Sequence, residues 1–468
     1  MGTIIKNGAI VTASDTYQAD ILIDGEQIAL IGRNLPTDNH EVIDATGKLL
    51  LPGGIDVHTH LELPFGGTVS SDDFFTGHQA AAFGGTTTHI DFSIQPKGGS
   101  LRQGIEQWHQ KAEGKAAIDY GFHMAITDLR DEVMAEIPSL VNEGVTSLKL
   151  FMAYKGVFQV DDTTLFRSML TAAEHGMLIM VHAENGDVVA ELTNKLLAEG
   201  KTTPKYHAVS RPAIVEGEAT GRAVALAGVA GAPLYVVHMT CTNALEQLAL
   251  GRDKGFKVMG ETCTQYMFIF EDDLGKPGYE GAKFVCSPPM RTPKDAEALW
   301  KALAHNTLQA VSTDHCPFWY EGGVNGRIAG KELGKASFDK IPNGVPGIED
   351  RMPVMWEHGV NQGRFSANRF VEITSTNPAK IFGLYPRKGV IAVGADADIV
   401  LWDPTKEHTI SARTHHMHTD YNLYEGMTVH GWPEQVLLRG KTIVQSAQWL
   451  GQQGAGQFLR RKAYAEVL

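Results

Sequence analysis

The chain is poor in cysteine. Its 468 residues include only Cys241, Cys263, Cys286 and Cys316, and no two of them form a CxxC pair. Scattered single thiols build neither a disulfide framework nor a thiolate metal site, and they are typical of a reducing compartment. The opening stretch MGTIIKNGAIVTASD also lacks the apolar core of a secretory signal. We therefore expect a cytoplasmic protein.

Positive charge and long apolar runs are scarce as well. The chain has 41 Lys and Arg residues against 54 Asp and Glu residues, a formal net charge of −13. A surface of that sign repels nucleic-acid phosphates and anionic lipids. The longest run without a charged or strongly polar residue, 223–237, is too short to span a bilayer. Neither nucleic acid nor membrane is an expected partner, which leaves a small-molecule substrate.

The pattern of apolar residues changes twice along the chain. Residues 1–53 and 378–446 read as short strands separated by turns such as Asn-Gly and Asp-Gly. Between them, in residues 54–377, strand-like runs alternate with helical stretches such as DDTTLFRSMLTAAEHG. This alternation predicts an α/β fold, a (β/α)8 TIM-like barrel. The two terminal segments together predict one small β-sandwich-like domain, because neither has enough strands alone. Residues 447–468 form a tail that neither domain needs, available for oligomer contacts.

Ionisable residues recur at the ends of the apolar runs in the middle segment. The run IDVHTH ends with His58 and His60, which share one face of a regularly alternating strand. Similar runs deliver Lys149 in SLKLF, His182 in LIMVHAE, His238 in LYVVHMT and Asp314 in STDHCP. Barrels of this type keep their working groups at the C-terminal ends of the strands. One strand-end histidine is more often structural, but five matching positions favour a metal site.

Lys149 is the least expected member of this set, because burial in an apolar run opposes the charged ammonium form. Its side chain either reaches solvent, or its neutral amine adds CO2 and becomes a carbamate. A carbamate has two anionic oxygens and can bridge two divalent cations, a pair that generates hydroxide at neutral pH. Nitrogen and oxygen ligands without cysteine favour zinc, with manganese or cobalt as alternatives.

These residues stand in blocks that resemble a known family. The chain is similar to the hydantoinase/dihydropyrimidinase family of binuclear metal-dependent amidohydrolases, above all to its D-hydantoinase members, in GGIDVHTHLELPFGGTVSSDDF, AAFGGTTTHIDF, SLKLFMAYKG, VHAENGD, SRPAIVEGEATGRA, CSPPMR, STDHCPF and PNGVPGIEDR. The blocks follow the family's order over nearly the whole chain. The resemblance implies that a metal-bridging hydroxide hydrolyses the cyclic amide bond of hydantoins or dihydropyrimidines to N-carbamoyl amino acids. It also implies a homotetramer or homodimer.

The resemblance further implies a role for each site residue. Two divalent metal ions are bound by His58, His60 and Asp314 on one side and His182 and His238 on the other, with N6-carboxylated Lys149, which needs CO2 or bicarbonate, as the bridge. Tyr154 donates to the oxyanion, and Asp314 moves the proton to the leaving nitrogen. Ser287 and Asn343 bind the ring through backbone groups, together with Tyr154. A pocket for the ring substituent is expected from Leu63, Phe65, Phe151 and Phe158.

Three other functions share parts of this pattern. Allantoinase uses the same ligands on a different ring, although PFGG and MAYKG favour hydantoinase. Dihydroorotase typically has an arginine two residues after the histidine pair to hold a carboxylate; here Glu62 takes that place and is expected to repel a substrate carboxylate. A non-catalytic dihydropyrimidinase-like scaffold is disfavoured because every ligand position is intact. The sequence leaves open the physiological substrate, the preferred enantiomer, the native metal and the oligomeric state.

Overall fold

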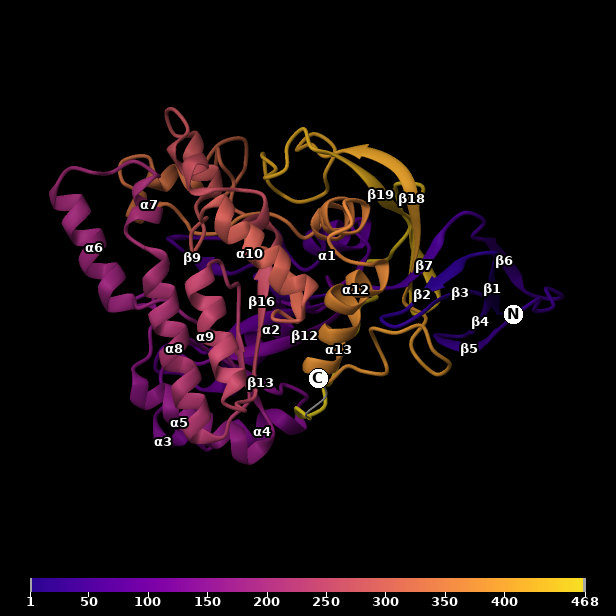
Figure 1. The fold of residues 1–468 in the computed structure, drawn as a ribbon, viewed down its shortest axis with the longest axis horizontal. Helices are drawn as coiled ribbons and strands as arrows, with labels where there is room; N and C mark the ends of the chain where they lie inside the picture. The colour runs from indigo at the N-terminus through magenta and orange to yellow at the C-terminus, as the bar shows by residue number, and fades with distance from the viewer. Residues whose placement is uncertain (1, 466–468) are drawn as a thin grey trace.

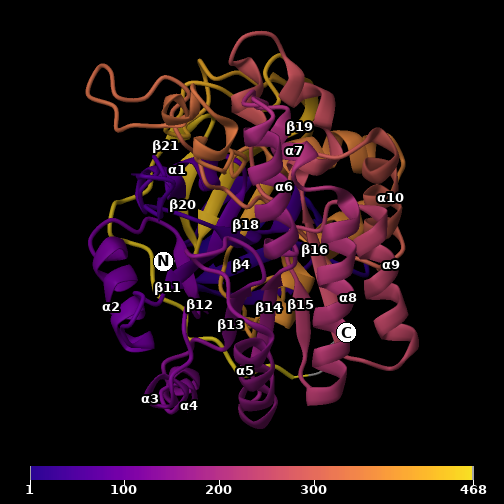
Figure 2. The same ribbon diagram turned by 90° about the vertical axis from the view of Figure 1, so that its left-hand side faces the viewer.

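Eight strands of the middle segment pair in parallel and are buried along nearly their whole length. The computed structural model describes residues 2–465, and Figures 1 and 2 show these strands at its centre with helices outside them. In spatial order the strands are β17 (Ala310–Ser312), β16 (Val258–Cys263), β15 (Leu234–Val236), β14 (Leu178–His182), β13 (Ser147–Phe151), β12 (Asp119–Ala125), β11 (Thr86–Ile94) and β8 (Gly54–Thr59). Burial on both faces is typical of parallel sheets covered by helices. The predicted (β/α)8 barrel is confirmed.

The two ends of this sheet meet at a seam held by one arginine. Just beyond β17, His315 forms a parallel bridge with Thr59 of β8. Arg351 is fully buried and donates from Nη1 to the carbonyls of Ile55, at 2.9 Å, and Val311, at 3.0 Å. A guanidinium offers several donors in a fixed plane, which suits it to link two strands that lack a full ladder between them. The barrel is therefore closed partly by a side chain.

The helices follow the strands in the alternation expected from the sequence. They are α1 (Thr76–Phe83), α2 (Leu101–Ala112), α3 (Asp131–Met134), α4 (Ile137–Asn142), α5 (Asp162–His175), α6 (Gly186–Ala198), α7 (Tyr206–Val209), α8 (Ala213–Ala230), α9 (Thr242–Asp253), α10 (Pro293–Ala304), α11 (Arg351–Met355), α12 (Ala367–Val371) and α13 (Asn377–Ile381). Local signals set their ends: Ser100 and Gln103 form a capping box on α2, and Gly176 ends α5 in the left-handed conformation.

Within residues 2–465 no helix combines the length and the apolar character needed to cross a membrane.

Short helical turns occupy the long connections around the barrel mouth. The 3-10 helices are η1 (Thr264–Met267), η2 (Glu271–Gly275), η3 (Glu280–Phe284), η4 (Lys331–Gly334) and η5 (Phe338–Lys340), and the π-helices are η6 (Trp356–Asn361) and η7 (Glu372–Thr376). Strands β9 (Pro64–Phe65) and β10 (Thr68–Val69) form a small hairpin after β8. These connections supply the walls above the C-terminal ends of the barrel strands.

The terminal segments share a second, smaller β domain, as predicted. One sheet has the order β21 (Gln448–Trp449), β20 (Lys441–Gln445), β19 (Thr428–Leu438), β18 (Ile399–Thr409), β7 (Leu49–Pro52), β2 (Ala9–Val11) and β3 (Thr16–Gln18), and the other β5 (Gln27–Gly32), β4 (Asp20–Asp24), β1 (Thr3–Lys6) and β6 (Glu41–Asp44). Antiparallel pairing of β7 with β18 joins the two ends of the chain. Buried Lys388 ties this domain to the barrel, because its amine lies 2.7 Å from both Asp119 and Asp398.

The C-terminal tail packs against the barrel rather than extending from it. Leu459 is buried among the side chains that fill the barrel interior. Arg461 is 3% exposed and donates to the backbone of Phe122 and to Oγ of Ser147, at the N-terminal ends of the strands. The expectation that neither domain needs the tail is wrong for these residues, because they cover the base of the barrel. Oligomer contacts by this segment stay a prediction.

Candidate metal centre and active site

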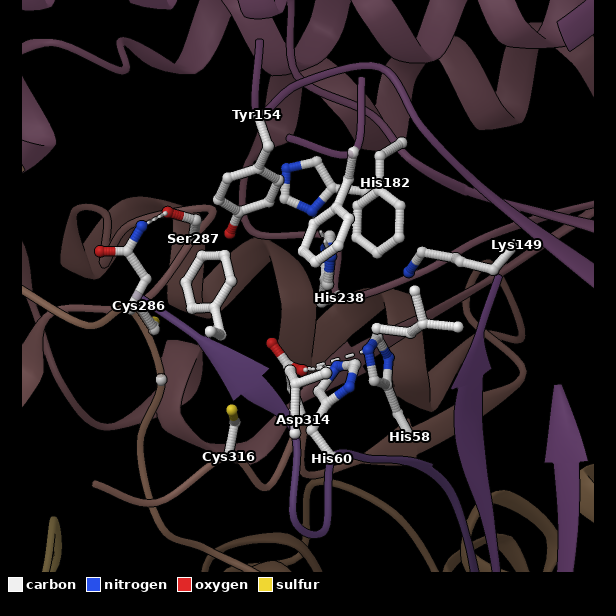
Figure 3. A pocket seen from close by; sticks show the side chains of 17 residues that line it. His58, His60, Lys149, Tyr154, His182, His238, Cys286, Ser287, Asp314 and Cys316 are labelled. Atoms are coloured by element: carbon white, nitrogen blue, oxygen red, sulfur yellow. Dashed lines mark hydrogen bonds and ion pairs between the residues drawn. The ribbon is translucent and has the colours of Figure 1, made fainter. Parts of the chain in front are cut away.

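Every site residue predicted from the sequence lines one cavity at the C-terminal ends of the barrel strands (Figure 3). The metal-ligand candidates are His58, His60, Lys149, His182, His238 and Asp314, and the other predicted residues are Leu63, Phe65, Phe151, Tyr154, Phe158, Ser287 and Asn343. Four further residues, Ile94, Cys286, Cys316 and Gly344, complete the lining. Residues that lie up to about 290 positions apart in the chain are thus brought to one place by the barrel topology.

A β-bulge in β8 aims the first two histidines. Asp56 pairs with His89 and Thr59 with Asp91, so three steps along β8 oppose two steps along β11. The bulge shifts the phase of the strand, as such insertions do. As a result, His58 and His60 both contact Phe92, at ring-centroid distances of 4.7 and 5.0 Å. Both imidazoles therefore face the barrel interior, even though apolar Ile55 and Val57 precede them on that side.

Three donor atoms meet at the end of β8. Oδ1 of Asp314 lies 3.1 Å from Nε2 of His58 and 3.1 Å from Nε2 of His60. The ligand atoms of the three residues lie within 4.8 Å of one another. Burial alone raises the pKa of Asp314, but the two histidines outweigh it and hold that pKa well below its usual range. Two imidazoles and an ionised carboxylate form a donor set that suits a divalent cation such as Zn²⁺.

A second pair of nitrogens converges on the opposite side. Nδ1 of His182 lies 2.9 Å from Nε2 of His238. Nε2 of His182 lies 2.8 Å from the Glu184 carboxylate, so that nitrogen carries the proton and Nδ1 keeps its lone pair. Burial lowers the pKa of both rings, and neutral imidazole is the form that binds metals. The second pair thus fits a second cation.

Lys149 faces the space between these two groups. Its amine points into the cavity beside His58, His182 and His238 (Figure 3). The residue is 1% exposed, and burial lowers the pKa of its amine to about 7. A neutral amine is the form that reacts with CO2. Of the two interpretations left open by the sequence, exposure of the amine to bulk solvent is excluded by this burial.

Three of the site residues adopt an unusual backbone conformation. Tyr154, His238 and Asp314 have φ angles of 67°, 39° and 52°. Residues other than glycine seldom occupy this region, and when they do they concentrate at functional sites, where the surrounding structure holds the strain. Each lies in the loop that follows a barrel strand, so the strain is located where side chains are turned toward the cavity.

Tyr154, Ser287 and Asn343 form the polar wall above the metal ligands. Nδ2 of Asn343 donates to Oγ of Ser287 at 3.1 Å. Burial raises the pKa of the Tyr154 phenol, while nearby Arg211 and a hydrogen bond with Ser287 lower it to a smaller extent. The phenol is therefore protonated at neutral pH and can donate a hydrogen bond into the cavity.

The predicted substituent pocket forms an aromatic cluster on one side of the cavity. Phe65 stacks on Phe158 at 5.9 Å between ring centroids, and Phe151 lies 5.1 Å from Phe158. Phe65 also meets Tyr154 edge to face at 5.4 Å. Leu63 completes the apolar lining. Phe65 and Phe158 also border a wider depression toward solvent, so this cluster forms the rim of the cavity.

Two buried carboxylates that the sequence analysis missed orient the histidine ligands. Oε1 of Glu261 lies 2.5 Å from Nδ1 of His58, and Tyr235 donates to its other oxygen at 3.0 Å. Glu184 holds His182 in the same way. Carboxylates that bind the far nitrogen of a metal-binding histidine fix its tautomer and its direction. In the sequence, the signals for these two residues are the glutamate within MGETC and the glutamate that ends VHAE.

Cys263 also lies near His58 and Glu261, with its ligand atom within 4.8 Å of theirs. Burial and the neighbouring carboxylates raise the pKa of this thiol well above its usual value. The thiolate, not the thiol, binds metals. Cys263 is fully buried and lies 3.3 Å from Oγ of Ser312, and it is absent from the lining of the cavity that holds the other ligand candidates.

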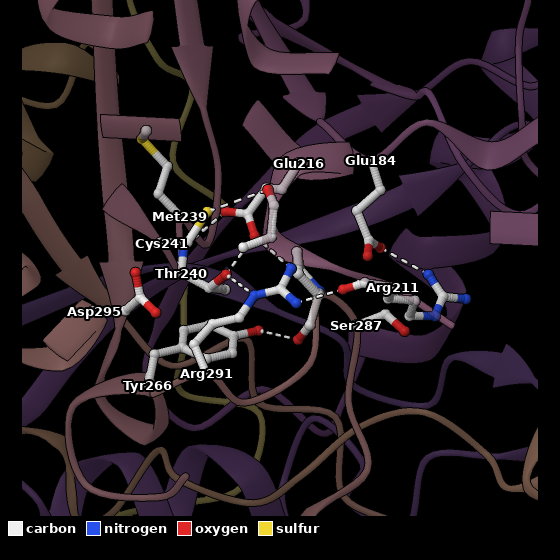
Figure 4. Close-up of polar contacts among 12 residues, drawn as sticks. Glu184, Arg211, Glu216, Met239, Thr240, Cys241, Tyr266, Ser287, Arg291 and Asp295 are labelled. Atoms are coloured by element: carbon white, nitrogen blue, oxygen red, sulfur yellow. Dashed lines mark hydrogen bonds and ion pairs between the residues drawn. The ribbon is translucent and has the colours of Figure 1, made fainter. Parts of the chain in front are cut away.

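A polar network behind the cavity supports the Glu184 side (Figure 4). Arg211 donates to Glu184 at 2.8 Å, and its own carbonyl accepts from Arg291. Arg291 is buried and also donates to Glu216 and Thr240, each at 2.9 Å. Although burial alone raises the pKa of Glu184, Arg211 and His182 hold it at about 2. Glu184 is thus anionic at neutral pH, which is the form that accepts the hydrogen bond from Nε2 of His182.

Glu62 does not line the cavity. Its backbone is left-handed, with φ of 51°, and its carboxylate lies 3.0 Å from the amine of Lys115, three residues beyond the end of α2. Lys111 donates to its carbonyl at 2.8 Å. The interpretation that Glu62 repels a substrate carboxylate is wrong, because its charge is directed toward this helix and is paired there. Glu62 therefore carries no information on the charge of the substrate.

We expect Glu261→Gln to weaken metal binding by about tenfold, because glutamine keeps the shape but loses the negative charge behind His58. The measurement is metal content after dialysis against a graded series of chelator concentrations. Glu113→Gln, an exposed position at the end of α2, is the matched control. Equal metal retention in both variants would show that Glu261 does not support the site.

Comparison with known proteins places the chain among cyclic amidohydrolases. Residues 49–443 match the model of the amidohydrolase family. A D-hydantoinase of Geobacillus stearothermophilus is 54% identical over 469 residues, covering 100% of this chain and 98% of the relative. The crystal structure of dihydropyrimidinase from Brevibacillus agri NCHU1002 is 55% identical with a TM-score of 0.97, and the match covers all of both chains. An L-hydantoinase (dihydropyrimidinase) from Arthrobacter aurescens is more distant, at 29% identity and a TM-score of 0.86, covering 97% of this chain and 99% of that one.

Proposed function

Because this chain belongs to the amidohydrolase family, and within it to the hydantoinases and dihydropyrimidinases, we propose that it hydrolyses the cyclic amide bond of hydantoins or dihydropyrimidines to N-carbamoyl amino acids. The observation that carries this function is the single cavity where two sets of metal donors, a buried lysine and a polar wall meet. The names of the relatives favour this substrate class over allantoin. The intact ligand set argues against a purely structural role.

The metal donors form two groups, and we assign one cation to each. His58, His60 and Asp314 would hold the first and His182 and His238 the second, and Lys149 as a carbamate would supply oxygen ligands to both. Zn²⁺ suits these nitrogen and oxygen donors best, with Mn²⁺ and Co²⁺ as alternatives. When bound, two such cations make hydroxide available at neutral pH and withdraw electron density from the scissile carbonyl.

Asp314 is proposed as the proton carrier. Its carboxylate faces the cavity, is anionic in the resting protein and lies 3.1 Å from the His58 and His60 rings. It takes a proton as the water nucleophile adds and delivers it to the ring nitrogen that leaves. One group can perform both transfers because the proton accepted in the first is the proton needed in the second.

Tyr154 is proposed to donate its phenolic hydrogen to the oxygen that becomes negative. The phenol lies on the wall opposite Asp314 (Figure 3) and its raised pKa keeps it protonated. A donor aimed at the developing charge stabilises the transition state more than the ground state. The left-handed backbone at Tyr154 holds the ring in that direction.

Ring recognition is proposed to use backbone groups of Ser287 and Asn343. Their side chains bond to one another at 3.1 Å, which leaves the main chain to read the alternating N–H and C=O groups of the ring. The aromatic cluster of Phe65, Phe151 and Phe158 receives the substituent. We propose a preference for the D enantiomer, supported by the higher identity to a D-hydantoinase than to the L-hydantoinase.

A substrate panel tests this function. Protein reconstituted with Zn²⁺, Mn²⁺ or Co²⁺ and bicarbonate is expected to hydrolyse dihydrouracil and D-5-benzylhydantoin. Values of kcat/KM for allantoin and dihydroorotate are expected to be lower by about 100-fold or more, because their polar groups meet an apolar substituent pocket. Protein stripped with a chelator is the control. Faster turnover of allantoin than of either expected substrate would contradict the assignment, and faster turnover of the L enantiomer would contradict the proposed preference.

We also propose that the protein works in the cytoplasm as a homotetramer or homodimer. All four cysteines are free and buried, which agrees with a reducing compartment. Sedimentation velocity of the purified protein measures the assembly directly.

A further inference from the structure

A second lysine, Lys331, is as deeply buried as Lys149 but lies outside the metal site. It begins η4 and has an exposed fraction of 0%. No carboxylate pairs with it in the described part of the chain, and burial lowers the pKa of its amine to about 7. Burying an amine is unfavourable unless its hydrogen-bonding capacity is satisfied. The contacts of its Nζ atom therefore indicate why a lysine is placed here.

The Lys331 amine connects two segments that form the polar wall of the cavity. It donates to the carbonyl of Val285 at 3.0 Å and to the carbonyl of Pro342 at 3.1 Å. Gly344 N–H donates to the same Val285 carbonyl at 3.0 Å. One segment therefore leads into Ser287 and the other into Asn343. The Lys331 amine and the Gly344–Val285 hydrogen bond thus fix the distance between the two segments together.

These contacts also set the direction of a peptide group. In a trans peptide the C=O and the following N–H point in opposite directions. The Pro342 carbonyl points at Lys331, so the N–H of Asn343 points away from Lys331; the Gly344 N–H points at Val285, so the Asn343 carbonyl points away from Val285. His207 performs the same task on the other segment, because its Nε2 lies 2.8 Å from the Cys286 carbonyl and so orients the N–H of Ser287.

We propose that Lys331 is a positioning residue for ring recognition: by holding the Val285 and Pro342 carbonyls it keeps the backbone of Asn343 at a fixed distance from that of Ser287, where both residues face the cyclic substrate. This inference rests on the proposed function, since it concerns how the same cavity recognises a ring. Without the amine, the Pro342 carbonyl loses its buried partner, and only the Gly344–Val285 and Asn343–Ser287 hydrogen bonds hold the two segments together. Ring binding then weakens, while the metal donors, which lie on other strands, are unaffected.

The contacts of Lys331 also distinguish it chemically from Lys149. Carboxylation would replace its donor hydrogens with anionic oxygens facing the two carbonyl oxygens of Val285 and Pro342, which is repulsive. Lys149, in contrast, faces cation-binding groups. Lys331 therefore stays an amine, and its use is to donate hydrogen bonds.

Lys331→Met tests the proposal, because methionine is close to lysine in length but cannot donate. We expect KM for dihydrouracil to rise about tenfold, in line with the loss of buried hydrogen bonds, with kcat changed less than about threefold. Metal content is expected to equal that of the parent. Lys335→Met, at an exposed position four residues later, is the matched control and is expected to match the parent. Lys331→Gln, which keeps an N–H donor on a shorter chain, is expected to show a smaller rise in KM.

Hydrogen exchange gives a second measurement that needs no substrate. In Lys331→Met we expect faster amide exchange in residues 285–288 and 342–345 than in the parent, with unchanged exchange at the metal ligands. An unchanged KM with unchanged exchange overturns the proposal. A parallel loss of kcat and metal in both Lys331 variants also overturns it, since that result indicates a general structural role. Absence of ring hydrolysis in the parent and in Lys335→Met refutes the proposed function instead, and exchange then still reports whether Lys331 holds the two segments.

Discussion

Lys149→Ala is expected to lose both metal ions and all measurable hydrolysis. Alanine cannot form a carbamate, so it removes the group proposed to supply anionic oxygens both to the His58, His60 and Asp314 set and to the His182 and His238 set. The remaining ligands then provide too little negative charge to hold two cations close together. The measurement combines metal content after gel filtration with kcat for dihydrouracil. Intact mass of the parent, recorded under mild conditions, is expected to exceed the sequence mass by one CO2.

Chemical rescue distinguishes loss of the proposed carbamate from a general effect of the substitution on folding. A short carboxylic acid such as acetate or propionate fits the space left by the side chain and is expected to restore part of the metal content and activity of Lys149→Ala. Lys155→Ala, at an exposed position in the following loop, is expected to behave as the parent. Full activity of Lys149→Ala without added acid would refute the bridging role.

Tyr154→Phe is expected to lower kcat by about 100-fold to 1000-fold while metal content stays at two ions per chain. The phenol is the donor on the wall opposite Asp314, and its raised pKa means that it donates rather than ionises. Phenylalanine keeps the ring that packs against Phe65 at 5.4 Å, so the aromatic cluster is preserved. Because the lost hydrogen bond is strongest in the transition state, KM is expected to change much less than kcat.

The control for this variant is Tyr17→Phe, which removes a hydroxyl from the small β domain, where 38% of the residue is exposed. Its kinetics are expected to equal those of the parent. A Tyr154→Phe enzyme with parental kcat would show that the oxyanion donor lies elsewhere. A variant with reduced metal content would instead indicate that Tyr154 supports the His182 side, against which its ring packs at 5.1 Å.

The local pattern of the sequence was enough for the barrel and for the candidate ligands. Alternating strand-like and helical runs predict strands that end at a common rim, and that rim is where His58, His182 and Asp314 lie. The roles of Tyr154, Ser287 and Asn343 came from the family resemblance and not from periodicity. They stay predictions, although all three residues line the cavity.

Other features depended on contacts between distant segments and left little trace in the sequence. Glu261 supports His58 across 203 positions, and Glu62 turns to Lys115 because of its left-handed backbone. The tail was predicted to be dispensable, yet Arg461 is buried at the base of the barrel. None of these follows from hydrophobic periodicity, because periodicity reports which face of an element is buried and not which partner it meets.

The sequence by itself determined the barrel, the position of the histidine and aspartate candidates at strand ends and of Lys149 within a strand, and the chemical types of the donors. It did so because strand and helix periodicities, and the requirement that a buried lysine be neutral or paired, are local properties. Only the tertiary structure decided which groups face one another. The bulge in β8, the carboxylates behind the histidines and the Lys331 contacts all arise from packing between strands and loops far apart in the chain. Distances of about 3 Å between such groups are set by that packing and by no single segment.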